Sequence, residues 1–69
     1  MGNTKQMIGQ LIRETRKRKG LTQEDLGRRL NVSRVVISDY ETGGQNLTLD
    51  TLDKVVEALG VNLKVSFSE

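Results

Sequence analysis

The segment 33–39 carries side chains whose chemistry matches the edges of base pairs. The guanidinium group of Arg34 can donate two parallel hydrogen bonds to O6 and N7 of guanine, and Asp39 can accept one from the amine of cytosine. Ser38 can bond to either type of base or to a phosphate, and Val35 can contact a thymine methyl group. Such a set reads DNA only if one rigid element presents it, so the surrounding elements decide the interpretation.

Those elements are predicted to be two short helices joined by a tight turn. Thr22 can cap the helix 23–30. Asp25, at the third helical position, can accept a hydrogen bond from the backbone N–H of Thr22 in return. Asn31 tolerates the left-handed conformation in which a helix ends, and Ser33 can cap a second helix over 34–41. Two capped helices with a three-residue turn form a helix-turn-helix, whose second helix enters the major groove of DNA.

Five residues would stand on the outward, N-terminal side of this second helix, and they are the candidate base contacts: Ser33, Arg34, Val35, Ser38 and Asp39. Arg34 is the strongest candidate for a guanine contact. Asp39 would repel a phosphate if it were misplaced. A carboxylate that stays in solvent and pairs with Arg34 or another cation is therefore an equal alternative for this residue.

Two further helices complete an all-α bundle of four helices. Residues 5–19 have an inward stripe at helical spacing, and a glycine follows as a C-terminal stop. This stripe is Ile8, Leu11, Ile12 and Thr15. Glycines mark 42–46 as a loop, and Thr48 then caps a last helix that ends at Gly60. The apolar stripe of this helix is Leu52, Val55, Val56 and Leu59. Sixty-nine residues allow one domain, 1–69, with a helical body over 1–60.

A long run of motif residues stands in register between residues 8 and 60. They are Ile8-Gly9-Gln10-Leu11-Ile12-Arg13, Arg16-Lys17-Arg18-Lys19-Gly20-Leu21-Thr22-Gln23-Glu24, Leu26, Val32-Ser33, Ile37-Ser38, Glu41, Gly43, Leu49-Asp50-Thr51-Leu52 and Ala58-Leu59-Gly60. On these residues the chain resembles the DNA-binding domain of the phage repressor and Cro family, the XRE-type helix-turn-helix. The resemblance implies a phage-repressor-like bundle. Gly27 departs from the family, where alanine is usual.

The resemblance also implies roles for individual residues. Gln23, at the start of the second helix, matches the residue that braces a backbone phosphate in the family, and the amides of that helix N-terminus add donors. Weaker candidates for phosphate contacts are Thr22, Arg18, Gln45 and Asn46. Arg16 and Glu41 match a cation and a glutamate that form a structural salt bridge in the family. The alternative for this pair is two unconnected surface charges.

Formal charge is divided unevenly along the chain. Residues 1–34 hold nine Lys or Arg and three Asp or Glu, a net charge of +6, whereas residues 35–69 hold two and six, a net charge of −4. The basic half contains the predicted helix-turn-helix, and Lys and Arg give sequence-independent affinity for DNA by neutralising phosphates. The alternative for the basic run 16–19 is a solvated helix end, where cations also favour the helix dipole.

The C-terminal segment 62–68 has the periodicity of a strand. Leu63, Val65 and Phe67 alternate with polar residues, and nothing else in the chain has a strand pattern. A lone strand cannot satisfy its own backbone groups. We therefore expect residues 61–69 to form a dimerisation strand that pairs with the same strand of a second copy across a two-fold axis. The alternatives are a disordered tail, or a strand that packs its apolar face on the first and last helices.

Several classes of function are disfavoured by what the chain lacks. It has no histidine and no cysteine, which removes the usual general base, zinc ligands and thiolates. It also has no phosphate-binding glycine loop, so we expect no catalytic residue, no metal and no cofactor. No apolar run approaches the ~20 residues of a membrane span and no signal-peptide pattern opens the chain, so a soluble, cytoplasmic protein is expected.

The sequence therefore predicts a sequence-specific, DNA-binding transcriptional regulator, and a repressor in preference to an activator. It would bind a palindromic operator as a homodimer through its third helix. A second reading is an antitoxin that also binds a protein toxin, because the strand after Ala58-Leu59-Gly60-Val61 is similar to HipB-type antitoxins, whose dimers carry a small intersubunit sheet. A small enzyme and a module that binds no DNA are the remaining alternatives.

Overall fold

The computed structural model describes residues 4–44 and 46–69, and within them the chain forms four helices and no strand. The helices are α1 (Thr4–Arg18), α2 (Gln23–Leu30), α3 (Arg34–Gly43) and α4 (Leu49–Leu59). The predicted bundle of four helices is confirmed. The bounds of α1 differ from the expected ones by a single residue at each end, and those of α2 do not differ.

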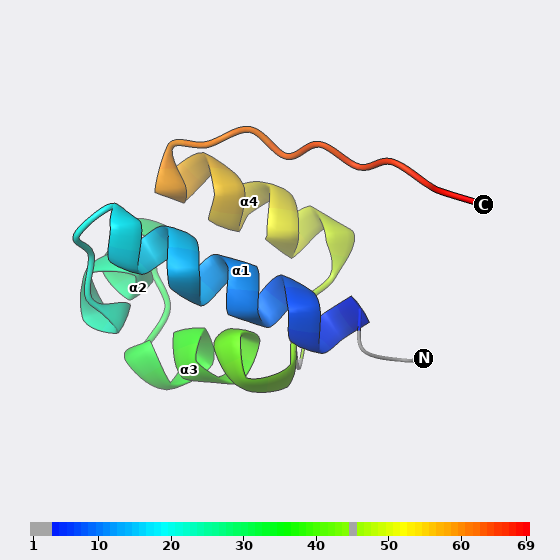
Figure 1. Cartoon of the computed structure of the whole chain (residues 1–69). Helices are drawn as coiled ribbons and strands as arrows, with labels where there is room; N and C mark the ends of the chain where they lie inside the picture. Colours follow the sequence, from blue (N-terminus) through cyan, green and yellow to red (C-terminus); the bar gives the residue numbers. More distant parts are fainter. Residues whose placement is uncertain (1–3, 45) are drawn as a thin grey trace.

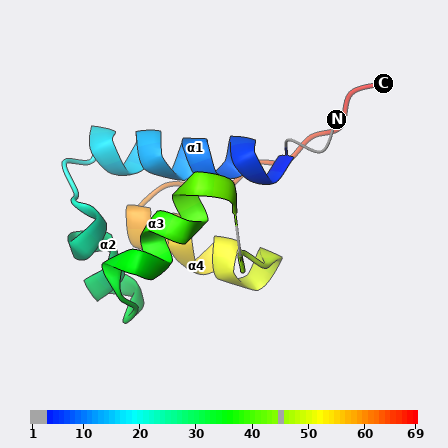
Figure 2. The ribbon, with the colours of Figure 1, turned by 90° about the horizontal axis from the view of Figure 1, so that it is seen from below.

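Helix α1 lies in the middle of the bundle, with α3 on one side of it and α4 on the other (Figure 1). Helix α2 packs against both α3 and α4. Seen from the α3 side, α3 lies nearest the viewer with no other helix in front of it (Figure 2). The outer face of α3 is therefore left free by the packing of the bundle.

Three of the four helices begin at a hydroxyl side chain. Thr22 accepts a hydrogen bond from the backbone N–H of Asp25, whose carboxylate accepts one from the N–H of Thr22, which completes a capping box. Ser33 caps α3 and Thr48 caps α4, each with a side-chain hydroxyl that accepts from the backbone N–H three residues later. These three caps fix where α2, α3 and α4 begin, as the sequence predicted.

The helix C-termini differ more from the expected ones. Asn31 and Gly60 end α2 and α4 in the left-handed conformation, as predicted. Helix α3 runs through Gly43 into the stretch 42–46 that was expected to be a loop, because Gly44 is the residue with the left-handed conformation (φ 65°). The backbone N–H of Gly44 donates to the carbonyl of Tyr40, which closes the last turn of α3.

The core lies where the four helices meet. Its buried apolar residues are Ile12, Leu26, Ile37, Tyr40, Leu52, Val55 and Leu59. Leu11 was expected on the inward stripe of the first helix, but its side chain is 57% exposed. It lines an apolar groove between α1, α4 and the segment after α4 instead of entering the core.

Two glycines permit close backbone approaches that position α3. A Cβ atom at Gly9 of α1 would lie 2.5 Å from the carbonyl oxygen of Tyr40, so α1 and α3 are in contact there backbone to backbone. A Cβ atom at Gly27 of α2 would lie 2.6 Å from the carbonyl oxygen of Val32 in the turn. Gly27, where the family usually has alanine, therefore lies where the turn comes too close to α2 for any larger side chain.

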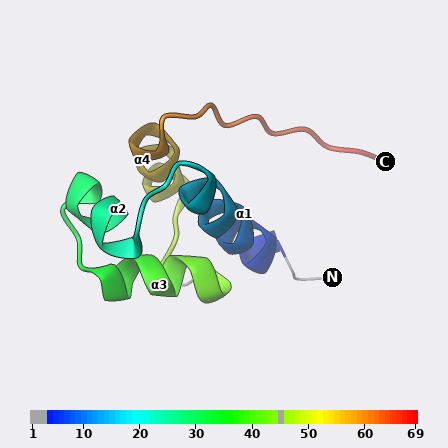
Figure 3. The same cartoon turned by 60° about the vertical axis from the view of Figure 1, so that its left-hand side comes forward.

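Residues 61–69 form no strand, so this prediction from the sequence was wrong for the single chain. A strand needs ladder hydrogen bonds to a neighbour, and the chain offers this segment none in its described part. The segment is extended and runs back beside α4, on the side of the molecule opposite α3 (Figures 1 and 3). None of the described helices is long and apolar enough to cross a membrane.

Candidate DNA-binding surface

The outer face of α3 carries the predicted base contacts. Arg34 and Ser38 are four residues apart, as are Val35 and Asp39, so they form two neighbouring rows on the helix surface. Arg34 and Val35 are exposed at the first turn, whereas Ser38 and Asp39 are half-buried. An apolar side chain such as Val35, exposed by 58% on a face without other large apolar groups, suits a thymine methyl.

The structure also defines the surroundings of Ser33 and Asp39. The hydroxyl of Ser33 accepts from the N–H of Val36 as the cap of α3, and the residue is exposed. Asp39 makes no ion pair within residues 4–44 and 46–69, so its expected alternative, a pair with Arg34, is not formed there. The contacts of all five residues with bases stay predictions.

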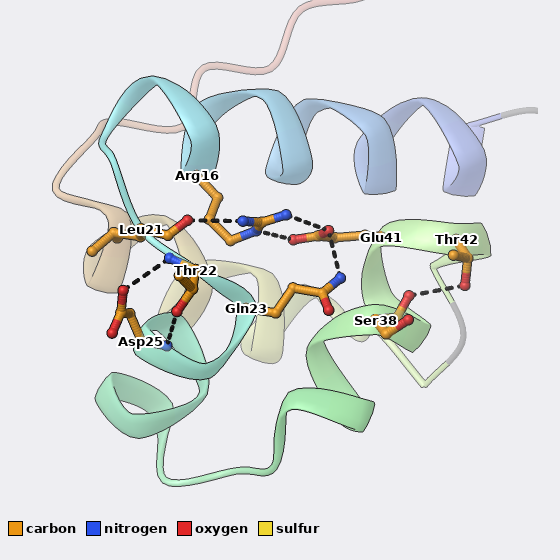
Figure 4. Close-up of polar contacts among 8 residues, drawn as sticks. All are labelled: Arg16, Leu21, Thr22, Gln23, Asp25, Ser38, Glu41 and Thr42. Atoms are coloured by element: carbon orange, nitrogen blue, oxygen red, sulfur yellow. Dashed lines mark hydrogen bonds and ion pairs between the residues drawn. The ribbon is translucent and has the colours of Figure 1, made fainter.

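Behind this face, a buried network joins α1, α2 and α3 (Figure 4). The Nε and Nη2 atoms of Arg16 donate to the two carboxylate oxygens of Glu41 at 2.6 and 3.1 Å, and both residues are 7% exposed. The Nη1 atom of Arg16 donates to the carbonyl oxygen of Leu21 at 2.8 Å. The two residues expected as a pair thus lie together in the bidentate geometry that favours arginine.

The same network holds Gln23. Its side-chain nitrogen donates to Oε1 of Glu41 at 3.1 Å, so one carboxylate serves both Arg16 and Gln23. A side-chain amide has two N–H groups, and this bond uses one of them. The second N–H can donate to a phosphate from a fixed position, which suits the role that was expected for Gln23.

An open depression, which we call the basic groove, lies where α1, α2 and α3 meet. It is lined by Arg13, Arg16, Leu21, Thr22, Gln23, Glu24, Arg34, Glu41 and Thr42. The groove brings together Arg34, which was predicted to contact a base, with Gln23 and Thr22, which were predicted to contact phosphates. Arg13 and Thr42 were missed. The signal for Arg13 was its place four residues after Gly9 and three before Arg16, on one face of α1.

Arg18 and Asn46, two other expected phosphate contacts, do not line the groove. Arg18 is exposed and donates to the hydroxyl of Thr15 at 3.2 Å. Asn46 is exposed with a φ of 60°, in the connection between α3 and α4. Gln45 lies outside the described residues.

The first turn of α2 contains an acidic side chain with a shifted pKa and backbone N–H groups without an acceptor. The backbone N–H of Thr22, donating to the carboxylate of Asp25, lowers the pKa of Asp25 below its ordinary value. The side chain of Thr22 and the guanidinium groups of Arg28 and Arg29 act in the same direction. The N–H groups of Gln23 and Glu24 have no acceptor within the described residues, so the first turn retains donors that an anion can use.

Known proteins share both the sequence pattern and this arrangement. A family model described as Helix-turn-helix matches residues 12–65, which is most of the chain. The chain belongs to this helix-turn-helix family. In its terms α2 and α3 are the two helices of the motif, and the basic groove lies beside them.

Similar sequences come from quite different sources. The chain is 39% identical to human Endothelial differentiation-related factor 1 over 57 residues, which cover 83% of this chain and 38% of that protein. It is 38% identical to Control protein C.BamHI of Bacillus amyloliquefaciens, covering 90% of this chain and 78% of that one. It is 37% identical to the Immunity repressor protein of Bacillus phage phi105, covering 90% and 43%. The chain thus spans less than half the length of two of these three relatives.

Solved structures share the fold. The restriction-modification controller protein C.AhdI from Aeromonas hydrophila superposes with a TM-score of 0.80 at 31% identity, covering 88% of each chain. A chain in the structure of the HipA-HipB-O2-O3 complex also has a TM-score of 0.80, at 21% identity and covering 96% of this chain and 93% of that one. At this lower identity the likeness establishes the fold alone, and a toxin partner stays a prediction from the sequence.

Proposed function

We propose that this protein is a sequence-specific, DNA-binding transcriptional regulator that inserts α3 into the major groove. The observation that carries the proposal is the uncovered outer face of α3, with Arg34 and Val35 exposed on it beside a side-chain amide fixed by Glu41. Base contacts then specify the sequence, while Gln23 and the first turn of α2 fix the register on the backbone. Relatives named as a control protein and an immunity repressor support this assignment.

Selection of bound sequences from a random pool of duplex DNA tests the proposal. The protein should enrich one motif, and its affinity for that motif should fall steeply as salt rises, because phosphate contacts release counterions. A variant with Arg34→Ala and Val35→Ala provides the control, since it removes base contacts and leaves the buried network intact. Equal recovery of every sequence by the unchanged protein would argue against specific binding.

We propose further that the protein binds its operator as a homodimer held by residues 61–69. Support comes from apolar side chains that the single chain leaves in solvent, because Val65 is 73% and Phe67 96% exposed. Residues 61–66 also form one wall of the apolar groove whose other walls are α1 and α4. Exposed apolar surface of this kind is typical of a protein interface. The segments lie opposite α3 (Figures 1 and 3), so their pairing leaves both α3 helices uncovered.

The symmetry of the selected DNA and the mass of the complex test the dimer. A two-fold dimer requires an inverted repeat whose half-sites lie about one helical turn apart or slightly more. Sedimentation of the complex should give two copies per site. One copy on an asymmetric site would refute the dimer and leave DNA binding itself standing.

A further inference from the structure

The basic groove contains positive charge that the protein does not neutralise. Its charged residues are three arginines and two glutamates. Arg16 is paired with Glu41, and Glu24 accepts from Nη1 of Arg28 at 3.2 Å. Within residues 4–44 and 46–69 the remaining two arginines, Arg13 and Arg34, make no ion pair. A groove with two exposed, unpaired guanidinium groups favours an anionic ligand.

Helix α1 holds Arg13 in place at this groove. Gly9 precedes it by four residues and sits directly against the carbonyl groups of Tyr40 and Glu41, while Arg16 follows by three and is locked to Glu41. Arg13 therefore stands between two fixed contacts on the same face of α1. Its position relative to α3 is set by the backbone and not by a flexible loop.

The polar lining of the groove is dominated by donors. The hydroxyl of Thr42 donates to the carbonyl of Ser38 at 2.9 Å, so its proton is already used inside α3. The carboxylate of Glu41 is occupied by Arg16 and Gln23. The groups that remain free to donate thus include the guanidinium groups of Arg13 and Arg34 and the second amide N–H of Gln23, beside the backbone donors in the first turn of α2.

We propose that Arg13 binds a phosphate of the DNA backbone in the basic groove, which makes α1 a DNA-contacting element beside α2 and α3. The proposal rests on the proposed DNA-binding function and names a contact that the sequence analysis did not include. A phosphate fits better than a base, because Arg13 comes from α1 and lies behind the helix that enters the major groove. The contact contributes affinity and register but no sequence preference.

The test compares Arg13→Gln with Lys54→Gln, which removes an equal charge from an exposed site on α4, across α1 from α3. Two probes are used: the duplex enriched by selection and a labelled duplex of random sequence. Arg13→Gln should weaken binding to both by roughly tenfold at low salt. It should also reduce the slope of log affinity against log salt by about one, whereas Arg13→Lys should restore the slope.

The possible outcomes distinguish a failure of the Arg13 contact from a failure of the proposed DNA-binding function. Equal affinity and slope for Arg13→Gln and Lys54→Gln would overturn the role of Arg13 while leaving DNA binding intact. A loss confined to the selected duplex would assign Arg13 to a base and overturn the phosphate contact. Failure of the unchanged protein to bind either duplex would reject the proposed function itself. Thermal unfolding of each variant checks the fold, which the exposed position of Arg13 should leave unchanged.

Discussion

At the scale of single residues, Glu41 is the side chain on which the candidate interface depends most. Its carboxylate is buried and receives hydrogen bonds from both Arg16 and Gln23. A buried charge is tolerated only when its partners are in place. The same group therefore links the stability of the bundle to the orientation of the Gln23 amide, which we propose contacts DNA.

Arg16→Ala should be strongly destabilising, because it leaves Glu41 buried with only Gln23 as a partner. The expected loss is about 3–5 kcal/mol in the free energy of unfolding. Arg28→Ala is the matched control, since it breaks surface pairs with Glu24 and Asp25 and should cost no more than about 1 kcal/mol. Urea unfolding of both variants measures the difference, and equal small losses would contradict the importance of the buried pair.

Arg34→Ala and Gln23→Ala should weaken DNA binding in different ways. Loss of the proposed base contact at Arg34 should cost ~1–3 kcal/mol of binding free energy on the selected duplex and relax the preference at one position. Loss of Gln23 removes the proposed phosphate contact and should weaken binding to good and poor sequences alike. Binding to a panel of single-base variants distinguishes the two patterns. The same loss of specificity in both variants would rule out this division of roles.

The lowered pKa of Asp25 gives a pH dependence whose sign is fixed. Because the carboxylate is stabilised in the folded state, its contribution is present above the pKa that Asp has in the unfolded chain. That contribution is lost as the pH falls through the folded-state pKa. Thermal unfolding across acid pH should therefore show a smaller decline for Asp25→Asn than for the unchanged protein. Parallel curves of thermal stability against pH would show that protonation of Asp25 does not change the stability of the fold.

At the scale of elements, the contact of α1 with α3 depends on the missing side chain at Gly9. Gly9→Ala should push the two helices apart and destabilise the fold by about 1–3 kcal/mol. Gly43→Ala is the control, because a Cβ atom there meets nothing within 4 Å and the residue has no positive φ. That change should stabilise the protein by roughly 0.4–1 kcal/mol. Similar stabilities for the two variants would mean that α1 can shift freely against α3.

The helices could be predicted from the sequence because their signals are local. Thr22, Ser33 and Thr48 cap the helices that follow them, and each cap bonds within three residues. The end of α3 could not be placed, since two adjacent glycines were available and only one adopts the left-handed conformation. The strand prediction failed because ladder bonds depend on a partner that a single chain does not contain.

The candidate site was predictable to a similar degree. The residues of α3 follow from helical spacing alone, and the pairing of Arg16 with Glu41 followed from the resemblance. The link from Gln23 to Glu41 was not foreseen, because it joins residues 18 positions apart through three-dimensional packing. Arg13 was missed for the same reason, since its role depends on how closely Gly9 lets α1 approach α3.

At the scale of the whole molecule, residues 63–69 should matter for association more than for the helical fold. Their removal takes up to three apolar side chains from a dimer, each worth roughly 1.5–3 kcal/mol if fully buried. The truncated protein should stay helical and sediment as a monomer. Its affinity for the selected duplex should become strongly dependent on protein concentration, because the two half-sites are no longer bound by linked subunits.

A full-length variant provides the control for this truncation. Replacing Lys64, Ser66 and Ser68 by alanine alters the other face of the same segment and should leave the dimer intact. Replacing Leu63, Val65 and Phe67 by serine should reproduce the truncation. A tight dimer in the truncated protein would transfer the interface to another surface, of which the exposed side of α4 is the first to examine.

The caps of α2, α3 and α4 also affect how fast the protein folds. Each helix can form its ends from residues within its own few turns, so little chain must be brought together before contacts form. Helical bundles of this kind fold within microseconds to milliseconds. Assembly of the proposed dimer is slower at low protein concentration, because it is a bimolecular step. After synthesis, the delay before an operator is occupied should therefore be set by the encounter of subunits, and it should shorten as copies accumulate.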